Sequence, residues 1–315
     1  MPGYISLSLD CEGKWGMSDQ YSNSLEFITS SKLSLVYSKI LKLLEKYQFP
    51  ATFGFVSGFC LEEDELAEYI NKLESPILFE KKDWLYNLKS DFKSRRFEGW
   101  SEPTLFKMVQ DSGLHHICTH GGMHVPYSER HTPIESVIED LKLINYFHET
   151  RNILTSCIIF PRNQVGYKKA ILSRGLKFYR EIDDHEKTTG SIGKLIRFSN
   201  EFINKDFNSF SSIPKNSDLS VARPLSKSKF MNAKIGLRKK ISTKATKKRH
   251  KQAMIFASTN KRVAHFYTHP HNFISDPSMF NKLEYFLKAA KNLEEEGFCR
   301  IITMKDEALL IEQNT

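Results

Sequence analysis

The sequence predicts an α/β fold in which strands and helices alternate along one domain, as a parallel sheet or a (β/α) barrel. Apolar runs of strand length recur along the chain, and most precede segments with apolar residues at helical spacing. Repeated strand-helix units are typical of parallel sheets and barrels rather than of separate α and β domains. The length of 315 residues also suits one domain, because α/β barrels often reach it.

Sequence patterns predict each element in order. Polar-apolar alternation predicts the first strand, buried apolar runs predict the later strands, and apolar residues three and four apart predict the helices. The expected strands cover 4–9, 51–56, 115–118, 154–160, 176–180, 263–267 and 298–303. The expected helices cover 32–47, 63–73, 132–147, 165–173, 244–256 and 277–296, and a short helix follows the last strand.

The helix expected over 132–147 has the clearest start signal. Thr132 as N-cap, Pro133 as the first helical residue and Glu135 at the third position match a capping box. Two stretches do not fit the strand-helix pattern: an excursion near 75–110 and a basic insertion near 219–262. We therefore expect a single barrel domain over 1–315 with these two additions.

Composition excludes several classes of protein. Hydrophobic residues make up 40% and charged residues 26% of the chain, which excludes a disordered or fibrous protein. The five cysteines are odd in number and show no C-x-x-C spacing, so we expect reduced, buried thiols. No apolar run is long enough to span a membrane, and alternation begins near the first residue instead of a signal peptide. The expected location is the cytoplasm, with peripheral binding at the inner face of the membrane as an option.

Polar residues gather just after four of the predicted strands, where the functional site of a parallel sheet or barrel lies. The segments are Asp10-Cys11-Glu12, Thr119 to His124, Phe160 to Asn163, and Thr268 to His271. Taken alone, a strand-end Asp-x-Glu pair is more often a helix cap or a solvated loop. An H-x-x-x-H spacing is also easily a coincidence among eleven histidines. Their joint placement at successive strand ends favours a site.

The spacing of these residues suits acid-base and metal chemistry. Asp10 and Glu12 lie two residues apart, so both project from the same side of an extended strand. One carboxylate can bind a cation while the other acts as a general base. His120 and His124 flank a Gly-Gly pair and can converge on one metal ion if the backbone turns tightly.

Taken in their order along the chain, these motifs resemble those of the polysaccharide deacetylases of carbohydrate esterase family four. That family includes chitooligosaccharide and peptidoglycan deacetylases. Residues 8–12 are similar to the opening D-x-D/E motif, and residues 51–56 to the A-T-F-F-V strand. Residues 120–124 match the H-x-x-x-H motif, His269-Pro270 resembles the late histidine motif, and residues 302–304 resemble the closing strand.

The resemblance implies a fold and a set of roles. The fold is a distorted, TIM-like (β/α) barrel of about seven strands. Asp10 is implied as the catalytic base and His269 as the general acid, while Glu12, His120 and His124 are implied to bind a divalent metal, usually zinc. The family usually has a second Asp where this chain has Glu12.

Other positions depart from the family pattern. The usual R-x-P-Y segment is replaced by residues 160–164, so we expect Arg162 to pair with Asp10 and Asn163 to contact substrate. Asp183 and Asp184 are the candidates for orienting the late histidine, with a solvated strand-end pair as an equal alternative.

Two loop residues keep alternative interpretations. Trp15 is expected either to stack against a sugar ring or to pack on the barrel rim. His271 is either a group that supports the site or an exposed residue.

The net charge of +9 comes from one segment, since residues 219–275 hold 14 Lys and Arg and no acidic residue. A solvated basic face is the usual meaning of such a run. It could instead attract a membrane surface, or the diphosphate of a lipid-linked or nucleotide-linked sugar. A nucleic-acid footprint is disfavoured, because it would not explain the acids and histidines at strand ends.

The resulting hypothesis is metal-dependent hydrolysis of an N-acetyl group from an amino sugar. The substrate is a glycan or its lipid-linked or nucleotide-linked precursor, which places the protein in polysaccharide biosynthesis. The alternatives are a deformylase or other amide hydrolase of the same superfamily, and an inactive barrel that binds glycans or nucleic acid.

Overall fold

Parallel strands form a closed ring in the computed structural model, which describes residues 2–20, 25–183, 210–214, 218–234 and 236–313. Their order is β1-β2-β5-β6-β7-β8-β9, and the pairing of β9 with β1 closes the ring. The members are β1 (Gly3–Cys11), β2 (Thr52–Phe55), β5 (His116–Thr119), β6 (Cys157–Ile158), β7 (Phe178–Ile182), β8 (Arg223–Phe230) and β9 (Val263–Thr268). A further strand, β10 (Cys299–Ile301), pairs with the start of β1. The expected (β/α) barrel of about seven strands is confirmed.

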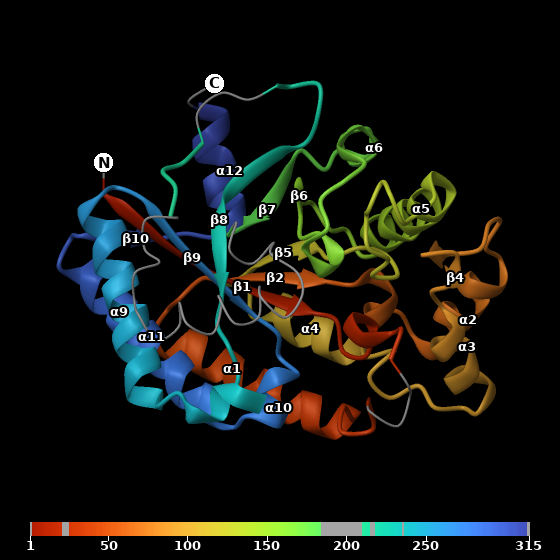
Figure 1. Ribbon diagram of the computed structural model, residues 1–315, viewed down its shortest axis with the longest axis horizontal. Helices are drawn as coiled ribbons and strands as arrows, with labels where there is room; N and C mark the ends of the chain where they lie inside the picture. The colour runs from red at the N-terminus through yellow and green to blue at the C-terminus, as the bar shows by residue number, and fades with distance from the viewer. Residues whose placement is uncertain (1, 21–24, 184–209, 215–217, 235, 314–315) are drawn as a thin grey trace.

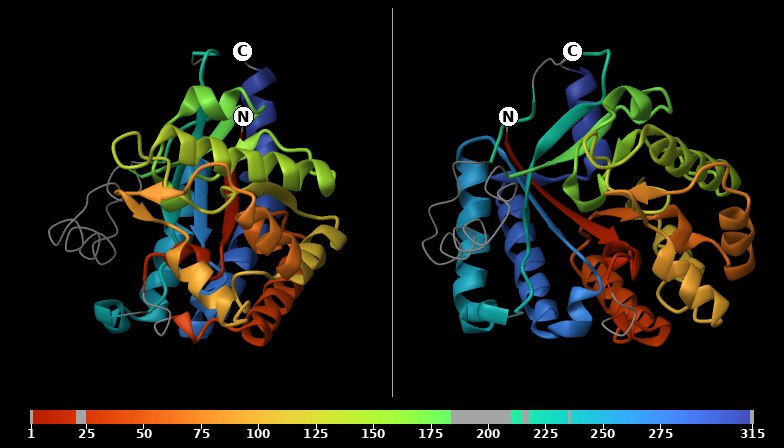
Figure 2. Two further views of the ribbon diagram at one scale, coloured as in Figure 1. Left: turned by 90° about the vertical axis from the view of Figure 1, so that its right-hand side faces the viewer. Right: turned by 45° about the vertical axis from the view of Figure 1, so that its right-hand side comes forward.

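Helices surround this ring. Figure 1 shows α9 and α11 on one flank, with α2, α3 and α5 on the opposite one, and Figure 2 shows α9 and α11 running side by side. Their bounds are α1 (Ser30–Lys46), α2 (Glu63–Asn71), α3 (Tyr86–Lys93), α4 (Pro103–Asp111), α5 (Ile134–Thr150), α6 (Lys168–Leu172), α9 (Thr243–Thr259), α10 (Asn272–Ser275), α11 (Ser278–Glu295) and α12 (Met304–Gln313). None of the helices in the described ranges is long and apolar enough to cross a membrane.

The stretch near 75–110 is more regular than expected. It contains a small hairpin, β3 (Leu78–Phe79) and β4 (Lys82–Asp83), followed by α3 and α4. Phe106 of α4 packs edge-on against Phe55 of β2, with ring centroids 5.5 Å apart. This part of the predicted excursion therefore belongs to the layer of helices that covers the ring.

Residues 219–262 are not an insertion, because they supply β8 of the ring and the flanking helix α9. The β8 segment reads R-P-L-S-K-S-K-F and lacks the apolar pattern of a buried strand. Ser226, Ser228 and Lys229 are nevertheless buried, so polar side chains occupy buried positions of this strand and no apolar run marks it in the sequence. The helix predicted over 244–256 is confirmed as α9.

Two local expectations can also be compared with the structure. The predicted capping box is wrong: Pro133 occupies the N-cap position of α5, and the Thr132 hydroxyl donates to the Pro126 carbonyl oxygen over 2.5 Å. The expected burial of the thiols is confirmed, since all five cysteines are free and buried.

Aromatic packing joins α11 to the ring. Phe286 is fully buried, and its ring centroid lies 5.3 Å from that of Phe266 in β9 and 6.0 Å from that of Phe49. We expect Phe286→Ala to lower the free energy of unfolding by about 3–5 kcal/mol, because it leaves a cavity in the core. Urea denaturation measures this loss.

The matched control is Lys288→Ala on the exposed face of the same helix. It should change the free energy of unfolding by no more than ~0.5 kcal/mol. A Phe286→Ala loss as small as that of the control would contradict the packing described here.

Candidate active site

The carboxyl ends of β1, β5 and β9 bring the predicted acids and histidines together. Glu12 follows β1, and its Oε2 atom lies 3.1 Å from Nε2 of His120 and 2.8 Å from Nε2 of His124. Nε2 of His269 lies 3.5 Å from Oε1 of Glu12 and 3.7 Å from Oδ2 of Asp10. The strand-end residues therefore form one cluster, as the parallel arrangement predicts.

Glu12, His120 and His124 have the donor set of a metal site. Nδ1 of His120 lies 2.9 Å from the Ile159 carbonyl oxygen. A carbonyl accepts only, so this nitrogen carries the proton and Nε2 presents a lone pair toward Glu12. Nε2 of His124 lies 3.2 Å from Nε2 of His120. Two imidazole nitrogens and a carboxylate oxygen that converge at these distances fit a divalent cation.

Two of the three candidate ligand groups, His124 and Glu12, have pKa shifts toward the deprotonated form that metal ligands need. Burial alone would lower the pKa of His120, but Asp10 and Glu12 reverse that effect and raise it. Burial lowers the pKa of His124 to about 4, so this imidazole is neutral. Burial alone would raise the pKa of Glu12, but His269 and His124 reverse that effect and hold it well below the usual value. Glu12 is therefore a carboxylate next to a neutral His124.

Asp140 of α5 shapes the loop between the two ligand histidines. Its carboxylate accepts the backbone N–H groups of Gly122, over 2.7 Å, and Met123, over 2.5 Å, and the hydroxyl of Tyr127 over 2.8 Å. A Cβ atom at Gly122 would lie 2.3 Å from the Asp140 carbonyl oxygen, so the loop and α5 are in direct backbone contact. A glycine at position 122 is therefore needed for this close approach.

Further contacts hold the same loop in a strained shape. His124 has a φ of +56°, in the left-handed region that costs energy for a residue with a Cβ atom. The backbone N–H groups of Ser57 and Gly58 donate to the carbonyls of Gly121 and Gly122 over 2.9 and 2.8 Å. The indole N–H of Trp84 donates to the Met123 carbonyl over 2.9 Å. These bonds turn the backbone so that the two imidazoles meet.

The longer Glu12 side chain is accommodated by a glycine. A Cβ atom at Gly16 would lie 2.1 Å from Oε1 of Glu12, well inside contact distance. Because residue 16 has no side chain, the glutamate carboxylate can occupy that space. This explains how Glu12 fits at a position where the family that the motifs resemble usually has an aspartate.

Asp10 forms a buried bidentate ion pair with Arg180 of β7. Nη1 and Nη2 of Arg180 donate to Oδ1 and Oδ2 of Asp10 over 2.5 and 2.8 Å. Burial alone would raise the pKa of Asp10, but Arg180 and His120 outweigh this effect and the pKa is lowered. Arg180 also donates to the Ser8 hydroxyl over 3.1 Å and lies 3.9 Å above the Tyr267 ring. The pair keeps Asp10 ionised and fixed in direction.

The expected pairing of Arg162 with Asp10 is therefore wrong. Arg162 and Asn163 have φ values of 51° and 53°, and this turn directs the Arg162 side chain to Asp19. Asn163 instead contacts Arg180, since its Oδ1 atom accepts a hydrogen bond from that guanidinium over 2.9 Å. Contact of Asn163 with substrate stays a prediction.

Arg180 itself carried a signal in the sequence. It is the last residue of the strand predicted over 176–180, and the functional residues of a parallel barrel lie at such strand ends. An arginine in a buried strand also needs an acidic partner, because an unpaired charge is costly to bury.

His269 is the partly exposed member of the cluster, with 22% of its side chain accessible. Its ring stacks on that of His271 at a centroid distance of 5.1 Å, and Nδ1 lies 3.4 Å from Nδ2 of Asn272. The other members are buried, so His269 is the group that a substrate can reach directly. Asp183, a candidate for orienting it, instead forms an ion pair with Lys229 over 3.0 Å, and Asp184 lies outside the described residues.

His271 is buried and lies beside the same carboxylate. Its Nδ1 atom is 4.0 Å from Oε1 of Glu12, and the three residues Glu12, His269 and His271 form a second group with metal-ligand chemistry. Of the two interpretations, support of the site therefore fits better than exposure.

Trp15 packs inside the protein rather than facing a ligand. It is fully buried, its indole N–H donates to the Trp100 carbonyl over 2.8 Å, and the two rings meet edge-on at 5.5 Å. Stacking of Trp15 against a sugar does not agree with this burial. Packing on the barrel rim, the other expectation, does.

Replacement of Arg180 and of Arg162 should differ in its effect on stability. Arg180→Gln should lower the free energy of unfolding by about 3–5 kcal/mol, because it leaves the buried Asp10 charge unpaired. Arg162→Gln should cost at most about 1 kcal/mol, because its partner Asp19 is exposed. Chemical denaturation of both variants checks this order, and equal losses would contradict it.

Comparisons with known proteins were made for sequence and for structure. No protein-family model matches the sequence, and no curated protein matches it. Among solved structures, a protein described as a polysaccharide deacetylase from Mycobacterium smegmatis matches with a TM-score of 0.60 and 10% identity. The match covers 98% of this chain and 90% of that chain.

Two further structures match nearly as well. A probable polysaccharide deacetylase from Pseudomonas aeruginosa PAO1 has a TM-score of 0.59 at 11% identity. A Puue allantoinase has a TM-score of 0.59 at 12% identity. Each match covers 97% of this chain and 89% of the other. At these identities the likeness shows the fold alone, and this chain shares the barrel fold of these structures.

Proposed function

We propose that this protein is a metal-dependent hydrolase that removes an N-acetyl group from an amino sugar. The observation that supports this most directly is the placement of an ionised Asp10, held by Arg180, beside the Glu12, His120 and His124 cluster. A base next to a metal site is the arrangement that amide hydrolysis requires. The shared fold with polysaccharide deacetylases supports the sugar substrate.

Glu12, His120 and His124 would hold the metal. One carboxylate and two imidazoles suit zinc, with positions left open for water and substrate. When bound, a divalent cation supplies Lewis-acid chemistry that makes water more acidic and polarises the acyl carbonyl. The Ile159 carbonyl would orient His120 through the hydrogen bond to Nδ1.

Asp10 and His269 divide the proton transfers in this proposal. Asp10 accepts a proton from the attacking water through Oδ2, which lies 3.7 Å from Nε2 of His269 and also accepts from Arg180. Oxygen adds to the carbonyl carbon, the C–N bond breaks, and His269 gives a proton to the departing amine. The products are acetate and the free amino sugar. An amine leaves poorly without this proton, so the exposed position of His269 matters.

A different amide substrate is the second candidate. The allantoinase matches this chain with a TM-score of 0.59, the same as one of the deacetylases. The proposed base, acid and metal ligands would serve a deformylase or another amide hydrolase equally well. A substrate panel of N-acetyl sugars, formamides and ureides separates these classes.

Metal binding is tested first. We expect about one zinc-like metal per chain in the wild type, and loss of this metal in the double variant His120→Ala/His124→Ala. His131→Ala, which changes a half-exposed histidine on the surface, should retain it. Elemental analysis measures metal, and circular dichroism checks the fold. Absence of metal in the wild type after incubation with zinc or cobalt would refute the proposal.

Activity is tested at Asp10. Asp10→Asn keeps the shape of the side chain but removes the base, so kcat for deacetylation should fall by about 10²- to 10⁴-fold. Asp19→Asn is the matched control, because this acid pairs with Arg162 and not with a group of the cluster. Metal content should stay near one per chain in both. Full activity in Asp10→Asn, or glycan binding without hydrolysis by the wild type, would contradict the proposed mechanism.

A further inference from the structure

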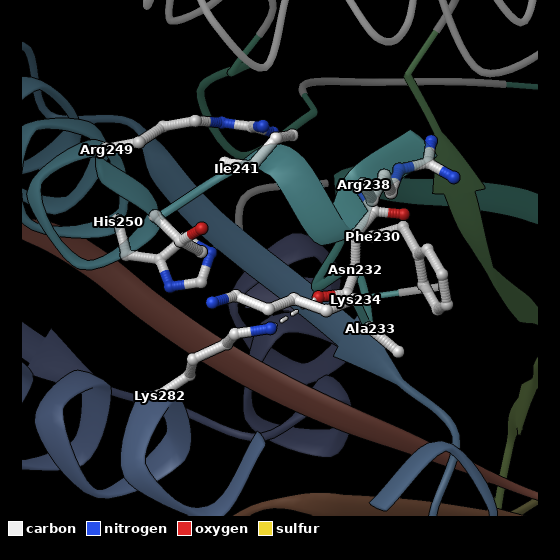
Figure 3. Close-up of a pocket in the computed structure, with 10 residues that line it drawn as sticks. Phe230, Asn232, Ala233, Lys234, Arg238, Ile241, Arg249, His250 and Lys282 are labelled. Carbon is white, nitrogen blue, oxygen red and sulfur yellow. Dashed lines mark hydrogen bonds between the residues drawn. The ribbon is translucent and has the colours of Figure 1, made fainter. Parts of the chain in front are cut away.

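A pocket lined with basic residues lies between the end of β8, α9 and α11 (Figure 3). About 350 Å³ of space free of protein atoms lies in and above it, part of it open solvent, and only about 20 Å³ admits the centre of a water-sized sphere. We call it the basic pocket, and its lining residues are Phe230, Asn232, Ala233, Lys234, Arg238, Ile241, Thr246, Arg249, His250 and Lys282. No aspartate or glutamate from the described ranges lines it.

Two of the lining cations are unpaired within the described parts of the chain. Lys282 is buried and donates to Asp276 over 3.0 Å and to the Asn232 carbonyl over 3.2 Å. Neither Lys234 nor Arg249 forms an ion pair with an acid of residues 2–20, 25–183, 210–214, 218–234 or 236–313. Figure 3 shows Lys234 extending toward His250 and Arg249 crossing above it. The pocket therefore carries positive charge that these residues do not neutralise.

A buried imidazole in the same pocket has an unused polar atom. His250 is 2% exposed, and its Nδ1 atom has no hydrogen-bond partner among the described groups. The other side of the ring packs in the core, with centroids 5.0 Å from Phe266 and 6.1 Å from Phe286. A buried polar atom without a partner is costly, and a ligand would remove this cost.

The basic pocket is next to the catalytic cluster. Phe230 lines it, and the same ring lies 5.1 Å from the His269 ring, centroid to centroid. One aromatic side chain thus separates the basic pocket from the proposed acid. The lysines that face solvent on α9, such as Lys248 and Lys251, do not line it.

We propose that the basic pocket binds a phosphoryl group of the substrate, so that the amino sugar is presented as a phosphate or diphosphate ester. Lys234 and Arg249 would supply charge, and His250 and Thr246 would supply hydrogen-bond donors. The location beside His269 connects this group to the sugar whose amide is cleaved. The sugar part of the inference rests on the proposed function, whereas the anion site stands on the pocket alone.

Inorganic pyrophosphate tests the anion site without any need for catalysis. Isothermal titration calorimetry should show binding to the wild type at fixed salt, and at least tenfold weaker binding to Lys234→Gln/Arg249→Gln. The matched control, Lys248→Gln/Lys251→Gln, removes the same charge from the exposed face of α9 and should bind like the wild type. Circular dichroism checks that each variant is folded. Equal weakening in both variants, or no binding to the wild type, would overturn the proposal.

Kinetics test the link to the substrate. For a nucleotide-linked N-acetyl amino sugar, or a lipid-linked one in neutral vesicles, the pocket variant should raise KM at least tenfold with little change in kcat. For a neutral N-acetyl oligosaccharide, KM should not change. Pyrophosphate binding with unchanged KM values would overturn the substrate assignment while leaving the anion site. If the proposed hydrolase function is wrong, neither the wild type nor any variant will turn over these substrates, while pyrophosphate binding is retained.

Discussion

The buried ion pair between Asp10 and Arg180 is the interaction on which the site depends. It joins β1 to β7 across the ring, and both side chains are almost fully buried. Such a pair is strongly destabilising when one partner is lost, because the other charge is left without water. The neighbours Ser8, Asn163 and Tyr267 surround the guanidinium and fix its plane. The protein thus keeps the Asp10 carboxylate ionised where burial alone would raise its pKa.

The rest of the site follows from close backbone contacts around this pair. Asp140 holds the loop between the two ligand histidines, and Gly122 allows that loop to touch α5. Gly16 leaves space for the Glu12 carboxylate in the same way. Strain at His124 is therefore balanced by several hydrogen bonds to the loop. A preorganised ligand set of this kind requires little movement before a cation or substrate binds.

Buried polar side chains of β1, β8 and β9 lie in the barrel between these strands. Ser226 and Ser228 of β8 are buried, and His265 of β9 lies 2.9 Å from the Ser8 hydroxyl. The catalytic cluster and the basic pocket meet at Phe230, which contacts His269 on one side and lines the pocket on the other. The segment that gives the chain its positive charge is therefore part of the barrel wall, close to the proposed chemistry.

The sequence alone was enough to predict the barrel and the residues of the strand-end cluster, because alternation, helical spacing and strand-end motifs are local signals. Most strands and helices were predicted to within a few residues, and Asp10, Glu12, His120, His124 and His269 do converge. Only the tertiary structure decided which arginine pairs with Asp10, because Arg162 and Arg180 differ in where the folded backbone directs their side chains. The tertiary structure also decided that 223–230 forms a strand, because a strand with buried polar residues has no apolar pattern in the sequence. It decided the burial of Trp15 as well, because a loop tryptophan is buried by residues far away in the sequence, such as Trp100.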